Sequence, residues 1–274
     1  MKRSQQYVAF RHARHQLLAR AKFELNRLHA RFNRNRSNAT FIAITGSSAK
    51  TTTSALLAHL LSGMEETHVQ ALDNELRDCI STLRTMSRHN RFVVCEVGAT
   101  KPGSVKPMVD LLKPSIGIVT MVALEHKSSF RTCEAVQEDK QTLVSGLPDY
   151  GLAILNYDDS RVLSMASLTR ARVKTFGETG GDYVISNVCA QNPRGTTLTI
   201  SHAGEAVQLK TQLTGAHQSV PVAAAFACAR ELGVPTVVCQ ERIASFKPVF
   251  GRCSVHAIDN GPIFIADTAK APYH

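Results

Sequence analysis

The sequence predicts an α/β fold: a mostly parallel P-loop sheet with helices on both faces, plus a small antiparallel β subdomain. Four short apolar runs, at 41–44, 92–95, 116–120 and 152–156, contain few polar residues. Such runs are typical of strands that are buried on both faces of a sheet. Segments with helical periodicity separate them. The first run leads into a loop of small residues, then a lysine and three threonines, which is the layout of a phosphate-binding loop.

Composition indicates a globular chain with an ordinary core. Of the 274 residues, 43% are hydrophobic and 20% are charged, as is typical of soluble domains. The sequence contains no apolar run of membrane-spanning length and no signal-peptide pattern. The seven cysteines are scattered and lack zinc-site spacing. This pattern favours a reducing compartment and therefore a cytoplasmic location.

The first 36 residues carry almost all of the net charge. They contain ten Lys or Arg and one acidic residue, Glu24, and so contribute +9 of the total of +10. Residues 5–34 read as a helix, and we define 1–36 as a basic, amphipathic N-terminal helix. Its apolar residues recur at spacings of three, four and seven, which predicts one apolar face. They are Phe10, Leu17, Ala21, Leu25, Leu28 and Phe32.

Two roles remain open for this helix. Its apolar face could pack on the following domain or on a protein partner, with a solvated basic face. Alternatively, the helix could lie on an anionic membrane surface, which would make the protein peripheral to the membrane. Nucleic-acid binding has no support elsewhere, because residues 37–274 carry a net charge of only +1.

The remaining elements follow in order. One helix is predicted to begin at Lys50, directly after the loop. A second is predicted to end at Arg88, and two more to span 105–112 and 132–146. Beyond Gly180 the pattern changes to strands at 183–188, 196–201 and 207–213 with turn signals between them, so an antiparallel subdomain is expected at about 181–214. Two helices (222–232 and 236–246) and a hairpin (255–258 with 262–266) complete the chain.

The loop matches the general pattern G-x-x-x-x-G-K-[ST] only in part. Ile44 and Ala49 stand where the pattern has glycines, and Gly46 is the only glycine in the loop. If Ala49 adopts a positive φ, alanine costs roughly 1 kcal/mol there. An ordinary strand-to-helix turn with a solvated Lys50 therefore remains open beside phosphate binding.

Four polar residues fall near predicted strand ends, where ligands bind to parallel sheets. They are Lys50, Glu96, His126 and Asp158. Glu96 suits a metal carboxylate. Each signal alone also fits a solvated or hydrogen-bonded side chain, and Lys140 alone reads as a solvated helix charge.

The order of these motifs resembles the Mur ligase family, and most closely its branch that adds D-alanyl-D-alanine to UDP-muramoyl-tripeptide. The similarity covers roughly residues 40–272. The most specific segment is EDKQTLVSGLPDYGLAILN, from Glu138 to Asn156. The others are GSSAKTT, Asp73-Asn74-Glu75, CEVGAT, GAHQ, Phe250-Gly251-Arg252 and Asp267-Thr268.

The resemblance implies that 37–274 is a central ATP-binding domain and assigns roles within it. The loop residues Gly46, Ser47, Ser48, Ala49, Lys50, Thr51 and Thr52 would bind the phosphates of ATP. Thr51 and Glu96 would bind a first Mg²⁺, and His126 and Lys140, the latter carbamoylated, a second. Lys50, Lys140 and His126 would be the catalytic residues. The adenine would lie at His217 and Gln218, the phosphates near Arg252, and the ribose at Asp267.

The resemblance implies an ATP-dependent ligase that joins a carboxylate to an amine through an acyl-phosphate, on a peptide or amino-acid-derived substrate. The family's UDP-binding domain is not recognisable, and its C-terminal domain is absent from this chain, which points to a substrate other than the usual UDP-muramoyl peptide. A non-catalytic Mur-like module that acts through a partner remains the alternative.

Overall fold

A nine-stranded sheet forms the centre of the protein. The structure, a computed structural model, describes residues 2–72, 74–125, 128–258 and 261–268. The strands are β1 (Thr40–Thr45), β2 (Thr67–Gln70), β3 (Phe92–Glu96), β4 (Ile116–Val119), β5 (Leu152–Asn156), β6 (Arg172–Gly177), β7 (Tyr183–Ala190), β8 (Thr196–His202), β9 (Glu205–Thr211), β10 (Ser254–Ala257) and β11 (Ile263–Ala266). The sheet order is β2-β3-β1-β4-β5-β6-β7-β8-β9, and β2 to β6 are parallel to β1.

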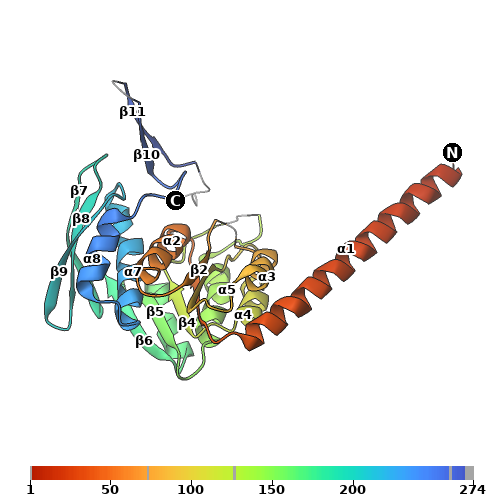
Figure 1. Ribbon diagram of the computed structural model, residues 1–274, viewed down its shortest axis with the longest axis horizontal. Coiled ribbons are helices and arrows are strands. Elements are labelled where there is room, and N and C mark those ends of the chain that lie inside the picture. Colours follow the sequence, from red (N-terminus) through yellow and green to blue (C-terminus); the bar gives the residue numbers. More distant parts are fainter. Residues whose placement is uncertain (1, 73, 126–127, 259–260, 269–274) are drawn as a thin grey trace.

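Helices cover both faces of this sheet (Figure 1). They are α1 (Lys2–Arg36), α2 (Lys50–Leu61), α3 (Leu76–Thr85), α4 (Val105–Leu112), α5 (Cys133–Ser145), α6 (Ser160–Ser164), η1 (Met165–Leu168), η2 (Ala216–Gln218), α7 (Ser219–Glu231) and α8 (Thr236–Ser245). Side chains of β1 alternate between two cores. Ile42 and Ile44 pack with α2, α7 and α8, whereas Phe41 and Ala43 pack with α3, α4 and α5. This double burial explains the continuous apolar runs, and the predicted fold class is confirmed.

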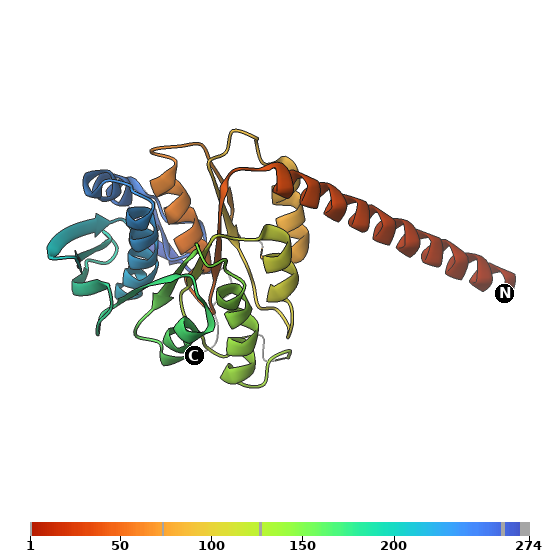
Figure 2. The ribbon, with the colours of Figure 1, turned by 90° about the horizontal axis from the view of Figure 1, so that it is seen from below.

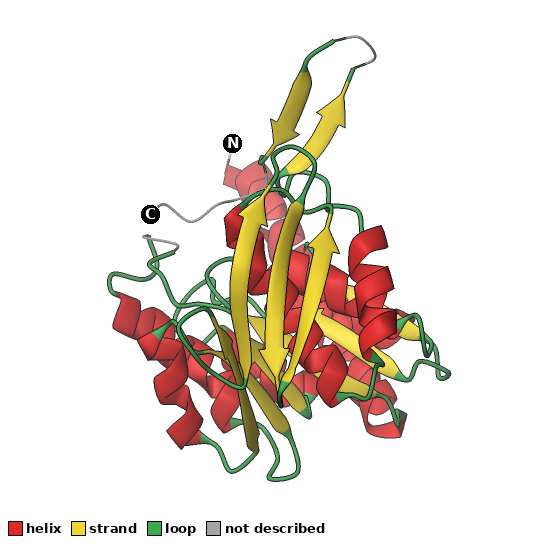
Figure 3. Cartoon of the chain, turned by 90° about the vertical axis from the view of Figure 1, so that its left-hand side faces the viewer, coloured by secondary structure: helices red, strands yellow, loops and turns green. Residues whose placement is uncertain are grey.

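The three antiparallel strands extend the main sheet. β7, β8 and β9 pair antiparallel, as predicted. However, β7 also pairs parallel with β6, through Phe176 with Tyr183 and Gly177 with Val184, so the strands near 181–214 continue the sheet instead of forming a separate one. They lie at its outer end (Figure 3), whereas β10 and β11 form a two-stranded hairpin that projects from the body (Figure 1).

Two strands and a short helical segment are additional to those expected. β2 reads THVQ and β6 reads RVKTFG, without a long apolar run. β2 is an edge strand, and only the last two residues of β6 are buried, so neither needs the composition of a strand buried on both faces. Asp159 caps the N-terminus of the helical segment formed by α6 and η1, because its carboxylate accepts hydrogen bonds from the backbone N–H of Arg161 and Val162.

Helix α7 presents small side chains to the core. It packs closely on α2, the helix that follows the phosphate-binding-type loop. Small residues let two helix backbones approach each other, because little side-chain volume separates them. The fully buried alanines of α7 are Ala223, Ala224, Ala225, Ala227 and Ala229.

Helix α1 leaves the body of the protein and projects beyond it (Figure 2). Its C-terminal part contacts α3 and α4. There Ala30 is fully buried, Asn33 Nδ2 donates to Leu83 O at 2.9 Å, and Arg34 donates to the carbonyls of Leu112 and Lys113. The Arg34 guanidinium also lies 4.0 Å from the centroid of the Phe41 ring.

The expectation that the apolar stripe of α1 packs on the following domain is wrong. The docked side carries Phe23, Ala30, Asn33 and Arg34 instead. The residues of the apolar stripe from Leu17 to Phe32 are exposed. Polar side chains make this contact because α3 and α4 end there, and the carbonyl groups of their last turns need hydrogen-bond donors. Among the described residues, no helix has the combined length and apolar character needed to cross a bilayer.

Candidate functional site

The loop after β1 makes a tight turn against the end of β4. Gly46 has a φ of 149°, and a Cβ at this position would lie 1.8 Å from Thr120 Oγ1. The same hydroxyl donates to Ser48 O at 2.6 Å. Gly46 is therefore required both for its backbone conformation and for close approach. The turn directs the following residues toward the N-terminus of α2.

Ala49 occupies the position before Lys50 in the left-handed region, with φ 66° and ψ −5°. The positive φ considered from the sequence is therefore present. Non-glycine residues are strained in this conformation because Cβ approaches the carbonyl oxygen. The loop thus holds a strained alanine where the general pattern has glycine.

Replacing this alanine is expected to stabilise the protein. Ala49→Gly should raise the free energy of unfolding by about 0.5 to 1 kcal/mol, because glycine adopts a positive φ without strain. Ala55→Gly, in the middle of α2, is the matched control and should lower it by about 1 kcal/mol. Urea denaturation of the three proteins measures both changes, and a destabilised Ala49→Gly would contradict this explanation.

Lys50 and Thr51 begin α2, where backbone N–H groups lack partners within the helix. Lys50 Nζ donates to Gly46 O at 2.5 Å, so the ammonium folds back over the loop. Thr51 and Thr52 are both buried. A helix N-terminus with a lysine above it attracts anionic oxygens.

Glu96, at the end of β3, lies beside Thr51 and is 1% exposed. Thr51 Oγ1 donates to Glu96 Oε2 at 3.1 Å, and Ser54 Oγ and the Leu72 N–H donate to Oε1 at 3.2 and 2.9 Å. Burial raises the pKa of Glu96, although these hydrogen bonds and the charge of Lys50 oppose the rise. Ser54, one helical turn from Thr51, was not predicted for this site.

These oxygens fit a hard divalent cation. Mg²⁺ takes oxygen ligands and commonly binds one or two protein groups, with waters and phosphates completing its shell. The buried Glu96 carboxylate and the Thr51 hydroxyl provide such a pair next to the helix N-terminus. Within the described ranges, no group of three or more His, Cys, Asp or Glu side chains is suited to hold a metal alone. His126, predicted for a second Mg²⁺, lies outside the described residues.

Neutralising Glu96 should separate stability from metal binding. Because its folded pKa is raised, ionised Glu96 lowers stability at pH values above that pKa. Glu96→Gln is therefore expected to keep or raise the melting temperature, while any Mg²⁺-dependent binding is lost. Thermal unfolding and calorimetric titration on the same samples test both parts. A fall in melting temperature would show that ionised Glu96 is stabilising.

Arg252 joins this group from the far end of the chain. Its Nη2 donates to Thr51 Oγ1 at 3.4 Å, so Arg252 lies with Thr51 and Glu96 at the start of α2, which begins at Lys50. The concentration of positive charge from two side chains and a helix N-terminus suits a polyanionic ligand.

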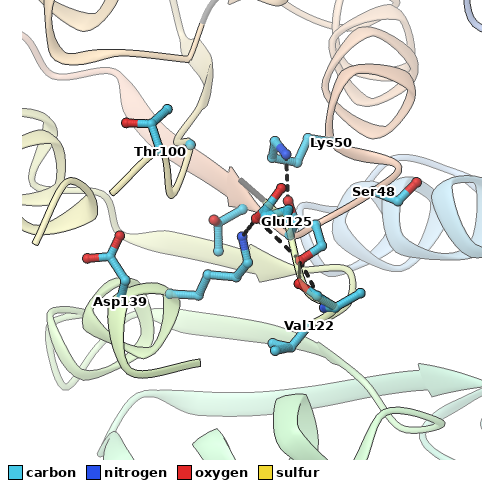
Figure 4. Close-up of polar contacts among 12 residues, drawn as sticks. Ser48, Lys50, Thr100, Val122, Glu125 and Asp139 are labelled. Carbon is cyan, nitrogen blue, oxygen red and sulfur yellow. Dashed lines mark hydrogen bonds and ion pairs between the residues drawn. The ribbon is translucent and has the colours of Figure 1, made fainter. Parts of the chain in front are cut away.

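Lys140, on α5, forms a buried ion pair with Glu125. Figure 4 shows Glu125 among the polar side chains around it. Lys140 is fully buried, and Glu125 is 9% exposed. Ser47 Oγ, which donates to Ala123 O at 2.8 Å, lies 3.3 Å from Glu125 Oε1. Burial, followed by the charge of Lys50, lowers the pKa of Lys140 to about 8, although Glu125 opposes this change.

Glu125 was not predicted as a site residue, although it directly precedes His126. Its position a few residues past β4, at the edge where ligands bind parallel sheets, is the signal that could have identified it. The neighbouring Asp139 has a structural role, because it accepts from Ser104 Oγ at 3.0 Å and so ties α5 to the start of α4.

His217 and Gln218 lie together in η2, after Gly215. Gln218 Nε2 is 3.0 Å from His217 Nε2, and Cys253 Sγ is 3.6 Å from the same nitrogen. Burial and the nearby Asp267 carboxylate raise the pKa of the Cys253 thiol. The structure therefore brings His217, Gln218 and Asp267 into one cluster and adds Cys253, which adjoins Arg252.

Asp158, the fourth strand-end residue, lies in a different environment. Its carboxylate accepts from the N–H groups of Glu178 and Thr179 at 2.6 and 2.9 Å, and from Thr179 Oγ1 at 2.5 Å. These bonds fix the turn between β6 and β7, so this side chain has a structural role.

Comparison with known proteins identifies the family. The model of the Mur ligase middle domain matches residues 44–229. The UDP-N-acetylmuramoyl-tripeptide–D-alanyl-D-alanine ligase of Mycobacterium bovis is 30% identical over 214 residues, which cover 77% of this chain and 42% of that protein. The Escherichia coli enzyme of the same name is 27% identical over 235 residues, covering 84% and 52%.

Solved structures agree in fold. MurF from Acinetobacter baumannii has a TM-score of 0.82 at 21% identity, covering 88% of this chain and 53% of that one. MurF ligase from Thermotoga maritima in complex with ADP has a TM-score of 0.79 at 22% identity, covering 91% and 58%. This chain thus spans about half the length of the relatives it matches. By its sequence match over 44–229, the chain belongs to the Mur ligase family and contains that family's middle domain.

Proposed function

We propose that this chain binds ATP with Mg²⁺ and takes part in an ADP-forming ligation of a carboxylate to an amine. The observation that supports this most directly is the convergence of Lys50, Thr51, Glu96 and Arg252 at the N-terminus of α2. The ligase names of the relatives and the ADP complex of one structural neighbour agree with it.

In the proposed reaction, a carboxylate oxygen of the substrate attacks the γ-phosphorus of ATP and ADP leaves. An amine then attacks the acyl carbon, phosphate leaves, and the amine gives up a proton. Mg²⁺ supplies charge neutralisation at the phosphates. Lys50 and Arg252 would hold phosphate oxygens, the N–H groups of residues 46–52 would orient them, and His217, Gln218 and Asp267 would contact the nucleoside.

The substrate is proposed to be a peptide or amino-acid derivative with a free carboxylate. The named substrate of the two curated relatives above, a UDP-N-acetylmuramoyl-tripeptide with D-alanyl-D-alanine, is one such pair. Other peptide carboxylates are equally compatible with the described residues, because the phosphate-binding group makes no distinction between them.

Lys140 is the proposed site of a carbamate, formed when its neutral amine bonds to CO₂ and releases a proton. Its lowered pKa, about 8, gives an appreciable neutral fraction near neutral pH. A carbamate would place a second negative charge beside Glu125, so the two groups would hold Mg²⁺, whose charge would offset theirs, and the modification should require the ion. Isotopically labelled bicarbonate with NMR detection would test this; a carbamate formed equally well without Mg²⁺ would refute the requirement.

The test of the proposed function is calorimetric titration of the whole chain with ATP, in Mg²⁺ and in chelator. Saturable binding that needs Mg²⁺ is expected. Release of ADP, not AMP, that depends on both a carboxylate and an amine would then support ligation. Absence of Mg²⁺-dependent binding would instead favour a non-catalytic module.

A further inference from the structure

The outward side of α1 carries a continuous apolar stripe that the described part of the domain leaves exposed. Residues Leu17, Ala21, Leu25, Leu28 and Phe32 recur at spacings of four, four, three and four, and therefore share one side of the helix. Their larger members are 69%, 67%, 58% and 54% exposed, for Leu17, Leu25, Leu28 and Phe32 respectively. Leu18, 58% exposed, widens the stripe. At 1.5 Å per residue it is about 22 Å long.

This stripe lies opposite the side by which α1 docks. The docked positions, Phe23, Ala30, Asn33 and Arg34, fall on the other side of the helix. The domain therefore holds the C-terminal part of α1 in place while the stripe faces away from it, even where the helix is docked. An apolar surface of this length on one helix indicates a binding face.

Charge decides what the stripe fits. The exposed basic residues of this part of α1 are Arg14, Arg20, Lys22, Arg31 and Arg36, whereas Glu24 is the only acid in residues 1–36. A second copy of the chain would bring two such basic faces together, and they would repel each other. A partner surface with an apolar interior and negative charges at its edge matches both the apolar stripe and the basic residues beside it. Leucine and phenylalanine on one side, with arginine and lysine around them, is the composition of interfacial helices.

We infer that α1 is an interfacial helix that attaches the protein to an anionic lipid surface. The apolar stripe enters the boundary between headgroups and acyl chains, and the surrounding Arg and Lys side chains contact lipid phosphates. α1 leads into the N-terminal end of β1, whereas the loop with Lys50 follows the C-terminal end of the same strand. Attachment by α1 therefore leaves the group around Lys50 accessible from solution.

Vesicle co-sedimentation tests this inference with the whole chain. The protein should bind vesicles that contain phosphatidylglycerol, bind pure phosphatidylcholine vesicles at least about ten-fold more weakly, and lose binding as salt rises. The stripe variant replaces three exposed leucines by serine, so folding should be retained. These are Leu17, Leu25 and Leu28. This stripe variant should bind anionic vesicles at least about ten-fold more weakly than the unmodified chain.

Two matched controls separate the stripe from general effects. The apolar control replaces three exposed residues on other elements by serine, and should bind vesicles as the unmodified chain does. These are Tyr150, Val237 and Ile265. The charge control compares two variants, each with three exposed Lys or Arg changed to Glu. One changes Arg20, Lys22 and Arg31 of α1, and the other changes Arg88, Arg194 and Lys210 on the rest of the chain. Only the first set should abolish binding.

Several outcomes would overturn the inference. These are no binding to anionic vesicles, equal binding by the stripe variant, or equal loss in both charge sets. Light scattering that shows a dimer, made monomeric by the stripe variant, would assign the stripe to a second copy instead. Calorimetry of Mg²⁺·ATP on the stripe variant, expected to be unchanged, keeps a failure of this inference distinct from a failure of the proposed function.

Discussion

Lys50→Ala is expected to weaken Mg²⁺·ATP binding at least about 100-fold, or about 2.7 kcal/mol. Lys50 Nζ donates to the Gly46 carbonyl within the loop, so its ammonium lies where phosphates bound to the loop would meet it. Contacts between an ammonium and phosphate oxygens are stronger than neutral hydrogen bonds, especially where water is partly excluded.

Calorimetric titration measures the change, and Lys101→Ala provides the control. Lys101 is an exposed lysine in the loop before α4, and its removal should leave the affinity within about two-fold. Lys50→Arg should recover only part of the binding, because the planar guanidinium is larger than an ammonium and holds oxygens in a fixed geometry. If Lys50→Ala bound ATP as tightly as the unmodified chain, the loop would be an ordinary strand-to-helix turn.

The second large effect is expected from the Glu125 and Lys140 pair. Glu125→Ala should lower the free energy of unfolding by about 3 kcal/mol, because it leaves a fully buried ammonium without its carboxylate. Lys140→Met should be milder, since Glu125, at 9% exposed, is less completely buried than Lys140 and keeps Ser47 Oγ within 3.3 Å. The double variant should recover much of the loss, because neither charge remains buried.

The pH dependence of this loss distinguishes an ion pair from simple packing. Lys140 has a lowered pKa, about 8. Below that value the ammonium is present and needs Glu125; above it the amine is neutral and the pair no longer forms. The Glu125→Ala loss should therefore be full well below pH 8 and should shrink as pH rises through it. Urea denaturation across this range measures it. A constant loss would assign the effect to packing.

The sequence predicted most of what lies near β1. β1, β3, β4 and β5 are buried on both faces, so their apolar runs were visible without the structure. β2 and β6 were not, because an edge strand and a partly exposed strand tolerate polar residues. The predicted bounds of the helices at 105–112 and 132–146 agree closely with those of α4 and α5, because their apolar residues recur at helical spacing.

Contacts that depend on where other elements end could not be predicted. The docked side of α1 was one, because Asn33 and Arg34 bind carbonyls at the ends of α3 and α4, far along the chain. The pairing of Lys140 with Glu125 was another, since it joins a helix to a loop and has no local pattern. The family resemblance assigned Lys50, Glu96 and Arg252 to one site, and only the fold supplied Ser54, beside Glu96, and Glu125, beside Lys140.

The alanine-lined contact between α7 and α2 has a thermodynamic consequence. α2 begins at Lys50, and α7 follows directly after His217 and Gln218, so the two proposed ends of a nucleotide site belong to one tightly packed pair of helices. A ligand that spans them meets groups already fixed at their mutual distance. Little conformational entropy remains to be lost on association, and the ordering of protein should contribute only weakly to the unfavourable entropy of binding.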